Sequence, residues 1–498
     1  MPHSSPFSAA AGVAALAFAL TALSGCSSVP HTGSAGAGPP AARMQASPAP
    51  LAARISELFA DSLFPPSAVS IKVVSLKDST VLYERNAGLL CNPASNQKLF
   101  TSAAALCMLG PYYRFNTIAA VDPVTRRIYL KGDGDPLLTG FDLDSMALAV
   151  QRALPRPGPW TVVGDASRFD TLYWGNGWMW NDASDPDGMG VSALTVNANT
   201  VEVHVRAGMR PGVPPAVTLI PPTGFVKVEN RANVADSVRQ ELSISRPLQH
   251  PSNAIVVSGD IRPGDHHSAS VSVFEPDRYT TVLFRESLER AGVRCSGLLM
   301  DTMPKGLRPA AVVSRRLDSV VMFMNKVSDN LSAECLIKTL GAVSTGGPGT
   351  WDSGTEAVRL FLASVGIDTT RIAVADGSGL SRYNLTNAET ILRLLTVMAA
   401  RPSLFGVYNS SLPVAGEDGT LARRMRGTPA ERRLRAKTGT LSGVTSLSGY
   451  APGADGELLG FSMIMANFAG PTRPYRAVQD SIGVLLSTWR KGGVRAVE

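Results

Sequence analysis

Three short strings carry side chains that could do chemistry together: Ser95-Asn96-Gln97-Lys98, Ser328-Asp329-Asn330 and Lys437-Thr438-Gly439-Thr440. The first places an amine three positions after a hydroxyl, the second a hydroxyl beside an amide, and the third a cation beside two hydroxyls. Acyl transfer to a serine requires these parts: a nucleophile, a base, and groups that hold the substrate and the developing anion. Together, in this order, the strings predict serine chemistry with lysine as the base.

Lysine is the preferred candidate for the base because all six histidines lie outside the three strings. Lys98 is the one lysine of the chain with a serine three positions before it. A free lysine has a pKa of about 10.4, so Lys98 needs burial and a second nearby cation, such as Lys437, to lose its proton near pH 7. A Ser-His-Asp triad assembled across long gaps stays an alternative, and so does a plain helix cap at Ser95.

A helix is expected to hold the first string. Residues 99–109 are apolar and rich in alanine, and Pro93 suits the first turn of a helix. Ser95 and Lys98 would then share one face of that helix, three positions apart. The free N–H groups at the helix N-terminus favour negative charge, which suits an oxyanion on the substrate.

The second string lies between two apolar segments, residues 320–326 and 331–336, which predict a helix, a short turn and another helix. The turn would put Ser328 and Asn330 on one side and Asp329 on the other. Ser328 could then pass a proton to the leaving amine, and Asn330 could hold Lys98 and the substrate amide. The simpler alternative is an ordinary helix cap, since Ser, Asp and Asn are the preferred capping residues.

The third string begins a segment that is typical of β-strands. Residues 444–450 and 458–465 are separated by a Pro/Gly-rich turn, which indicates a hairpin. Gly439 leaves room for another backbone, so a peptide substrate could lie alongside this strand.

The polar groups of the third string suit a peptide with a free C-terminus. Lys437 and the hydroxyls of Thr438 and Thr440 would bind a terminal carboxylate. The Thr440 N–H would join the Ser95 N–H as the oxyanion hole.

On these residues the chain resembles low-molecular-mass class C penicillin-binding proteins of the D-alanyl-D-alanine carboxypeptidase/endopeptidase (DacB-like) family. Further similar stretches are Ser192-Ala193-Leu194, residues 376–382 and residues 412–421, and the likeness extends over nearly everything after residue 52. The resemblance implies hydrolysis of the D-Ala-D-Ala bond, or of D-amino-acid cross-links, in peptidoglycan through an acyl-enzyme. It also implies inhibition by β-lactams and a reaction that needs no cofactor.

Carried over by position, the resemblance implies roles for individual residues. Ser95 would be the nucleophile, Lys98 the proton acceptor and Ser328 the second active serine. The implied partners in substrate binding are Asn330, Lys437, Thr438, Gly439, Thr440, Arg382 and Asp165, the last of which would meet the amine of the stem peptide.

Two other functions compete with this interpretation. A β-lactamase is disfavoured because the chain lacks a Glu-x-x-Leu-Asn string and has too long an interval between the first two strings. A non-catalytic lipoprotein that binds wall peptides is disfavoured because every catalytic residue type is present.

The fold implied by the resemblance is the α/β β-lactamase/transpeptidase-like fold, an antiparallel sheet flanked by helices. Residues 51–119 and 306–498 would form this catalytic domain. A hairpin at residues 68–83, the strands after Thr440 and an amphipathic tail helix at residues 474–490 would build it. Residues 120–305, with short Val-rich strands and many turns, would form a mostly β insertion between the first two strings.

The N-terminal segment predicts export. Residues 1–25 read as a signal peptide that ends in Leu23-Ser24-Gly25 before Cys26, a lipoprotein cleavage box. The first ten residues contain no Lys or Arg, which departs from the usual signal. Cys26 would carry the lipid, and residues 26–50, rich in Ser, Gly, Ala and Pro, would be a flexible tether. The expected place is the periplasm, on the outer membrane.

Composition limits the kinds of binding partner that the protein could have. The net charge is +7 without basic clusters, which argues against nucleic acid and favours anionic wall or lipid groups, or no special partner. Metal binding is not expected, because zinc-type Cys and His spacings are missing from the sequence. An oxidising compartment permits disulfides among Cys91, Cys107, Cys295 and Cys335, but three pairings are open.

Overall fold

The structure is a computed structural model and describes residues 50–60, 64–247 and 252–492. The predicted signal peptide, Cys26 and residues 27–49 of the tether lie outside the described residues.

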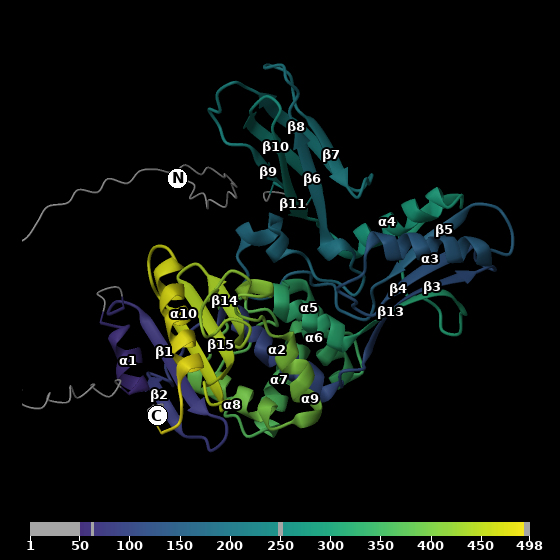
Figure 1. The fold of residues 1–498 in the computed structure, drawn as a ribbon. Coiled ribbons are helices and arrows are strands. Elements are labelled where there is room, and N and C mark those ends of the chain that lie inside the picture. The colour runs from purple at the N-terminus through teal and green to yellow at the C-terminus, as the bar shows by residue number, and fades with distance from the viewer. Residues whose placement is uncertain (1–49, 61–63, 248–251, 493–498) are drawn as a thin grey trace, which may run out of the picture. The chain divides into compact units, whose positions relative to one another are not determined.

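A five-stranded antiparallel sheet joins the two ends of the described chain, in the order β14-β15-β16-β1-β2 (Figure 1). The N-terminal hairpin lies beside the last strand, with Ala68 opposite Ala466. Both predicted hairpins are confirmed. The strands are β1 (Ala68–Ser75), β2 (Val81–Arg85), β14 (Arg435–Leu441), β15 (Val444–Pro452) and β16 (Leu458–Ala466).

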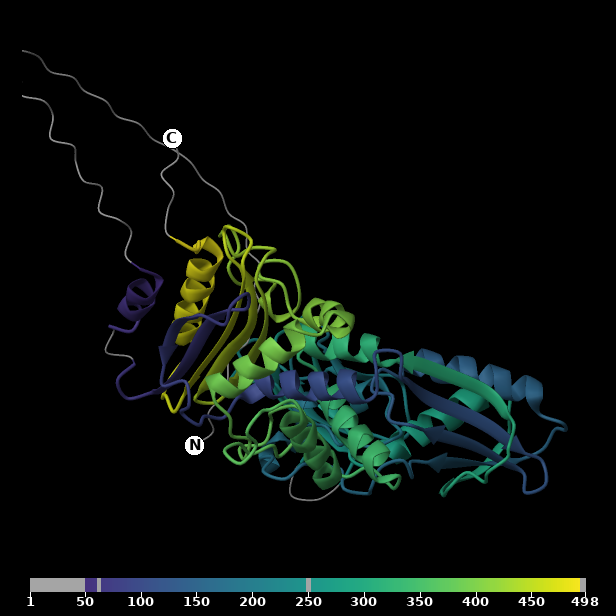
Figure 2. The ribbon, with the colours of Figure 1, turned by 90° about the horizontal axis from the view of Figure 1, so that it is seen from below.

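Helices cover both faces of this sheet, as Figure 2 shows with α1 and α10 on one side and α8 on the other. Successive side chains of a strand point to opposite faces, and β16 follows this rule. Met463 and Met465 belong to the core under α10, whereas Ile464 and Ala466 belong to the core around α2. The predicted tail helix is confirmed as α10 (Arg473–Thr488).

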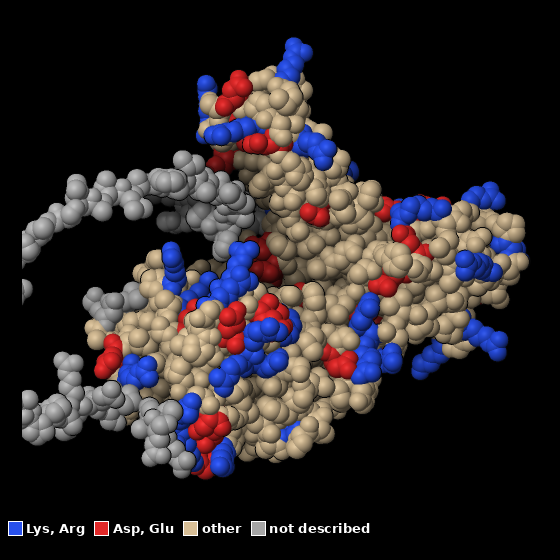
Figure 3. Space-filling view, in the orientation of Figure 1, with Lys and Arg blue, Asp and Glu red and all other residues tan. Residues whose placement is uncertain are grey.

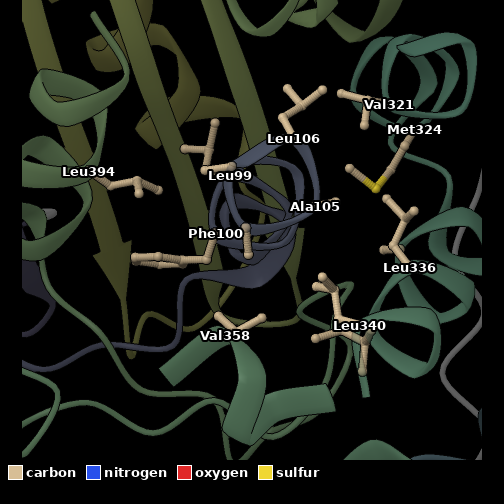
Figure 4. Packing of buried hydrophobic residues seen from close by; sticks show 14 of the residues in the cluster. Leu99, Phe100, Ala105, Leu106, Val321, Met324, Leu336, Leu340, Val358 and Leu394 are labelled. Atoms are coloured by element: carbon tan, nitrogen blue, oxygen red, sulfur yellow. The ribbon is translucent and has the colours of Figure 1, made fainter. Parts of the chain in front are cut away.

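The helix after Ser95, α2, lies in the centre of the second core. Its residues from Gln97 to Leu106 are all buried. Figure 4 shows Leu99 and Phe100 among side chains of the surrounding helices, including Leu336 and Leu394. An apolar helix enclosed on every side holds its N-terminus rigidly, which fixes the position of Ser95. The helices of this domain are α1 (Leu51–Glu57), α2 (Gln97–Met108), α5 (Leu317–Val327), α6 (Asn330–Thr345), α7 (Trp351–Ser364), α8 (Ala388–Ala399), α9 (Pro402–Ser411) and α10.

The insertion contains three sheets, in the orders β12-β5-β4-β3-β13, β11-β6-β7 and β8-β10-β9, and has its own apolar core. It is mostly β, as expected, with two helices that pack together. The elements are β3 (Arg114–Asp122), β4 (Arg127–Gly132), α3 (Gly140–Ala153), β5 (Trp160–Asp165), β6 (Thr200–Arg206), β7 (Ala216–Ile220), β8 (Lys227–Val234), β9 (Ser243–Ser245), β10 (Ala254–Ile261), β11 (His266–Ser272), α4 (Pro276–Arg290), β12 (Cys295–Met300) and β13 (Pro309–Arg316).

The limits predicted for the insertion, residues 120 and 305, are too narrow. Its first and last strands, β3 and β13, pair with each other inside the five-stranded sheet of the insertion. The chain crosses between the helical domain and the insertion twice. The two crossings lie side by side, since the Leu317 N–H donates to the Tyr113 carbonyl at 2.8 Å. Gly110 and Pro111 lie at the first crossing, between α2 and β3, whereas at the second crossing β13 runs directly into α5.

Two further findings concern the chain's environment. All four cysteines of the described segments, Cys91, Cys107, Cys295 and Cys335, are free thiols. Within residues 50–60, 64–247 and 252–492, no helix combines the length and the apolar character needed to cross a bilayer.

Candidate active site

Ser95 lies on a tight turn rather than in the α-helix itself. Residues Ala94–Asn96 form a 3₁₀ turn (η1) that leads into α2, and Ala94 has φ of 47°. A left-handed alanine is strained and persists only where its surroundings enforce it. Asn92 enforces it here, since its Oδ1 accepts a hydrogen bond from the Ala94 N–H at 2.8 Å. The turn leaves Ser95 partly exposed at the floor of a pocket.

Lys98 points at Ser95 with the geometry of a base. Its Nζ lies 3.0 Å from Ser95 Oγ, 2.6 Å from Asn330 Oδ1 and 2.8 Å from the Ser378 carbonyl. A neutral amine has two N–H donors and one lone pair. The amide oxygen and the carbonyl can only accept hydrogen bonds, so they take both donors. The lone pair is then directed to the Ser95 hydroxyl.

The surroundings of Lys98 favour this neutral form. The side chain is fully buried, and burial lowers the pKa of Lys98 to about 8 against the opposing pull of Glu334 and Asp376. About one molecule in ten is then neutral at pH 7. The predicted burial of Lys98 is present.

Glu334 on α6 is a part of the site that the sequence patterns did not reveal. Its carboxylate accepts hydrogen bonds from the N–H groups of Gly377 (3.0 Å) and Ser378 (2.7 Å) and from Trp351 Nε1 (2.8 Å). Burial raises the pKa of Glu334 to about 7. Because the Ser378 carbonyl binds Lys98, Glu334 fixes the position of the amine through this loop. A signal was available in hindsight, since Glu334 interrupts the apolar pattern one turn after Asn330.

The second string forms the predicted turn between α5 and α6. Ser328 ends α5 with a φ of 67°, and Asp329 caps α6 by accepting the Ser332 N–H at 2.7 Å. The capping alternative is therefore true of Asp329, while its neighbours face the pocket. Asn330 also donates from Nδ2 to the Asp187 carbonyl at 2.9 Å, which orients its Oδ1 toward Lys98.

The third string lies on β14, beside the turn that holds Ser95. Lys437 Nζ donates to Ser328 Oγ at 2.8 Å and to the Thr438 carbonyl at 2.9 Å. The lysine is fully buried, and burial, followed by the charge of Lys98, lowers its pKa well below the usual value. As predicted, Lys437 lies close enough to Lys98 for their charges to act on each other, but Lys437 is buried behind the pocket wall.

Gly439 is required by the close approach of β14 to the turn. A Cβ at this position would lie 2.2 Å from Ser446 Oγ, 2.8 Å from the Pro93 carbonyl and 3.0 Å from the Ser95 nitrogen. The backbone that approaches is therefore that of the turn that holds Ser95. Any larger residue would force Ser446 or the turn from Pro93 to Ser95 to move.

A pocket of about 310 Å³ opens over Ser95. Six residues of the three strings line it, namely Ser95, Ser328, Asn330, Thr438, Gly439 and Thr440, whereas Lys98 and Lys437 lie behind its walls. The remaining wall comes from Asp187, Arg424 and Arg476, among others. The structure thus brings the three strings together from distant parts of the chain.

The prediction that Asp165 belongs to the site is wrong. Its carboxylate is buried within the insertion, where it binds Lys131 Nζ at 2.8 Å and the Met303 N–H at 2.9 Å. The acid that the insertion contributes to the pocket is Asp187, which lies on a short 3₁₀ turn (η3, Pro186–Gly188). Arg382 does not line the pocket. It is exposed and donates to the Ser442 carbonyl at 3.2 Å, just past the third string.

A comparison with known families decides what this pocket belongs to. The model of the D-Ala-D-Ala carboxypeptidase 3 (S13) family matches residues 51–488. The chain belongs to the S13 family. This membership makes it a serine-type hydrolase of the carboxypeptidase and penicillin-binding class, as the resemblance implied.

Individual relatives agree with the S13 assignment. A D-alanyl-D-alanine carboxypeptidase of Actinomadura sp. (strain R39) is 36% identical over 460 residues, which are 87% of this chain and 84% of the relative. The carboxypeptidase DacB of Haemophilus influenzae is 28% identical over 415 residues, 81% of this chain and 86% of that protein. The crystal structure of penicillin-binding protein 4 (dacB) from Haemophilus influenzae has a TM-score of 0.78 at 24% identity over 87% of this chain and 99% of that one. The predicted fold is confirmed.

Proposed function

We propose that this S13 enzyme cleaves the terminal D-Ala-D-Ala bond of peptidoglycan stem peptides, and the D-amino-acid bond of cross-links, through an acyl-enzyme on Ser95. The observation that carries the proposal is the position of Lys98, whose amine has one lone pair left for the Ser95 hydroxyl. A nucleophile, a base beside it and an open pocket over both are the parts that acyl transfer needs.

The first half-reaction follows from these contacts. Lys98 takes the Ser95 proton while Oγ attacks the carbonyl carbon of the penultimate D-alanine. The tetrahedral oxyanion is stabilised by the N–H groups of Ser95 and Thr440. The proton then passes from Lys98 through Ser328 to the leaving nitrogen, the C–N bond breaks and the last D-amino acid leaves. Lys437 orients the Ser328 hydroxyl for this transfer.

In the second half-reaction water attacks the ester carbonyl, which releases Ser95 and a peptide with a free carboxylate. A β-lactam would react by the same first half, since its ring contains a strained amide. The opened ring would stay attached as the leaving group, so the acyl-enzyme would persist. Penicillin-binding protein 4 of Haemophilus influenzae has been crystallised in complex with a β-lactam.

Digestion of purified peptidoglycan followed by mass analysis tests this proposal. We expect wild-type enzyme to remove one alanine from pentapeptide stems, which reports carboxypeptidase activity, and to reduce cross-linked dimers, which reports endopeptidase activity. Ser95→Ala should leave both unchanged. Wild-type enzyme that alters neither stems nor dimers would contradict the proposed reaction.

We further propose that Cys26 carries a lipid that holds the enzyme on the periplasmic side of the outer membrane. The support is the sequence Leu23-Ser24-Gly25-Cys26 and the Ser/Gly/Ala/Pro-rich residues that follow, a composition suited to a flexible tether. We expect the full-length protein to partition into detergent and Cys26→Ser to partition into the aqueous phase after export. Equal partition of the two proteins would contradict lipidation. A control, Cys295→Ser, should behave like wild type.

A further inference from the structure

The cation expected to bind a substrate carboxylate does not face the pocket. Lys437 is fully buried and its Nζ is engaged by Ser328 and by the Thr438 carbonyl. Burial, and then the charge of Lys98, lowers the pKa of Lys437 well below its usual value. The cations that do line the pocket are two arginines from other parts of the chain, Arg424 and Arg476.

These two arginines differ in their partners. Arg424 binds the Asp480 carboxylate at 2.8 Å and donates to Gln479 Oε1 at 3.2 Å, so its charge is compensated. Arg476 donates to Thr440 Oγ1 at 2.8 Å. In the part of the chain that the structure describes, no carboxylate lies within the 4.0 Å ion-pair distance of Arg476.

The position of Arg476 favours an anion. The residue lies in the first turns of α10 and reaches across to β14, and Figure 3 shows blue groups on the α10 side of the central recess. Partial burial, and then the charge of Arg424, lower the pKa of Arg476 from its usual value against the smaller opposing effect of Asp480. A bound anion would stabilise such a cation. The planar guanidinium still has N–H groups free to bind a carboxylate in the two-pronged way that arginine prefers.

We propose that Arg476 binds the free carboxylate of the D-amino acid that leaves, together with the hydroxyls of Thr438 and Thr440. The two threonines are two positions apart on β14 and so share a face. The Thr438 hydroxyl donates to Thr420 Oγ1 at 2.7 Å, and the Thr440 hydroxyl oxygen accepts from Arg476. This inference rests on the proposed reaction at Ser95, and it assigns the recognition of a free C-terminus to α10 rather than to Lys437.

A pair of substrates isolates this role. One is a peptide that ends in D-Ala-D-Ala with a free carboxylate, and the other is its C-terminal amide. For Arg476→Gln we expect kcat/KM on the free acid to fall about 30- to 100-fold, the usual loss of a charged hydrogen-bonded contact. The value on the amide should change less than about twofold. Arg476→Lys should recover part of the loss, and Arg473→Gln, an exposed change on the same helix, should match wild type.

The outcomes separate this inference from the reaction itself. A similar fall on both peptides, or no fall on either, overturns the role of Arg476. Wild-type enzyme that releases no D-alanine from the free acid overturns the proposed reaction and the inference with it. Thermal unfolding of each variant, measured in parallel, distinguishes a lost contact from a lost fold.

Discussion

A fluorescent penicillin will label the wild-type enzyme and leave Ser95→Ala unlabelled, and the peptidase rate of this variant will fall at least about 10⁴-fold. Alanine has no oxygen to form the acyl bond, and Ser95 is the pocket serine whose hydroxyl lies 3.0 Å from the Lys98 amine. Ser95 is partly exposed and its hydroxyl contacts Lys98, so its loss should leave the fold intact. Labelling is followed by gel fluorescence, and turnover by release of D-alanine.

Ser364→Ala provides a matched control for this experiment. Ser364 lies at the end of α7, where its hydroxyl donates to the Phe361 carbonyl at 2.7 Å, outside the pocket. This variant should be labelled like wild type. Equal labelling of Ser95→Ala and wild type would show that the acyl group goes to another residue.

The second large effect concerns Lys98 and pH. Acylation needs the neutral amine, and the pKa of Lys98 is about 8. The kcat/KM for peptide, or the acylation rate constant for penicillin, should therefore fall about tenfold per pH unit below 8 and level off above it. Lys98→Met should be slower by at least about 10³-fold and should lose this acid limb, because methionine binds no proton. Stopped-flow acylation between pH 5.5 and 9.5 measures both.

Glu334 and Lys437 also titrate near the site, so the profile needs a control. Glu334→Gln keeps the shape of the side chain but removes an ionisable group. The pH–rate profile of this variant should keep its acid limb, with a shifted midpoint. Circular dichroism over the same pH range shows whether the fold is constant. A wild-type rate that does not vary between pH 6 and 9 would exclude Lys98 as the base.

The sequence predicted the parts of the site whose chemistry is local. Ser95 and Lys98 lie within one turn of chain, and the turn at Ser328-Asp329-Asn330 is marked by residues that end and begin helices. These side chains were expected to lie together in space, because acyl transfer requires all of them around one carbon atom. The hairpins and the tail helix were predictable since their apolar periods match the faces that they bury, as Met463 and Ile464 show.

Contacts that depend on tertiary packing were not predictable in this way. Asp165 and Asp187 are both acids of the insertion, and local patterns do not tell which of them returns to the pocket. Glu334 looks like an ordinary helical residue until Trp351 and the Ser378 loop close over it. Arg476 resembles a solvent-facing residue of an amphipathic helix. In each case the decisive partner lies on a distant segment.

The neighbouring positions of β1 and β16 in the sheet have a consequence for biogenesis. The first strand cannot complete its hydrogen bonds until Leu458–Ala466 has been made, nearly four hundred residues later. Such long-range pairing is slow to form. A chain emerging in order would hold Ser95 on an unfinished scaffold, so the enzyme would become competent only when its last strand arrives.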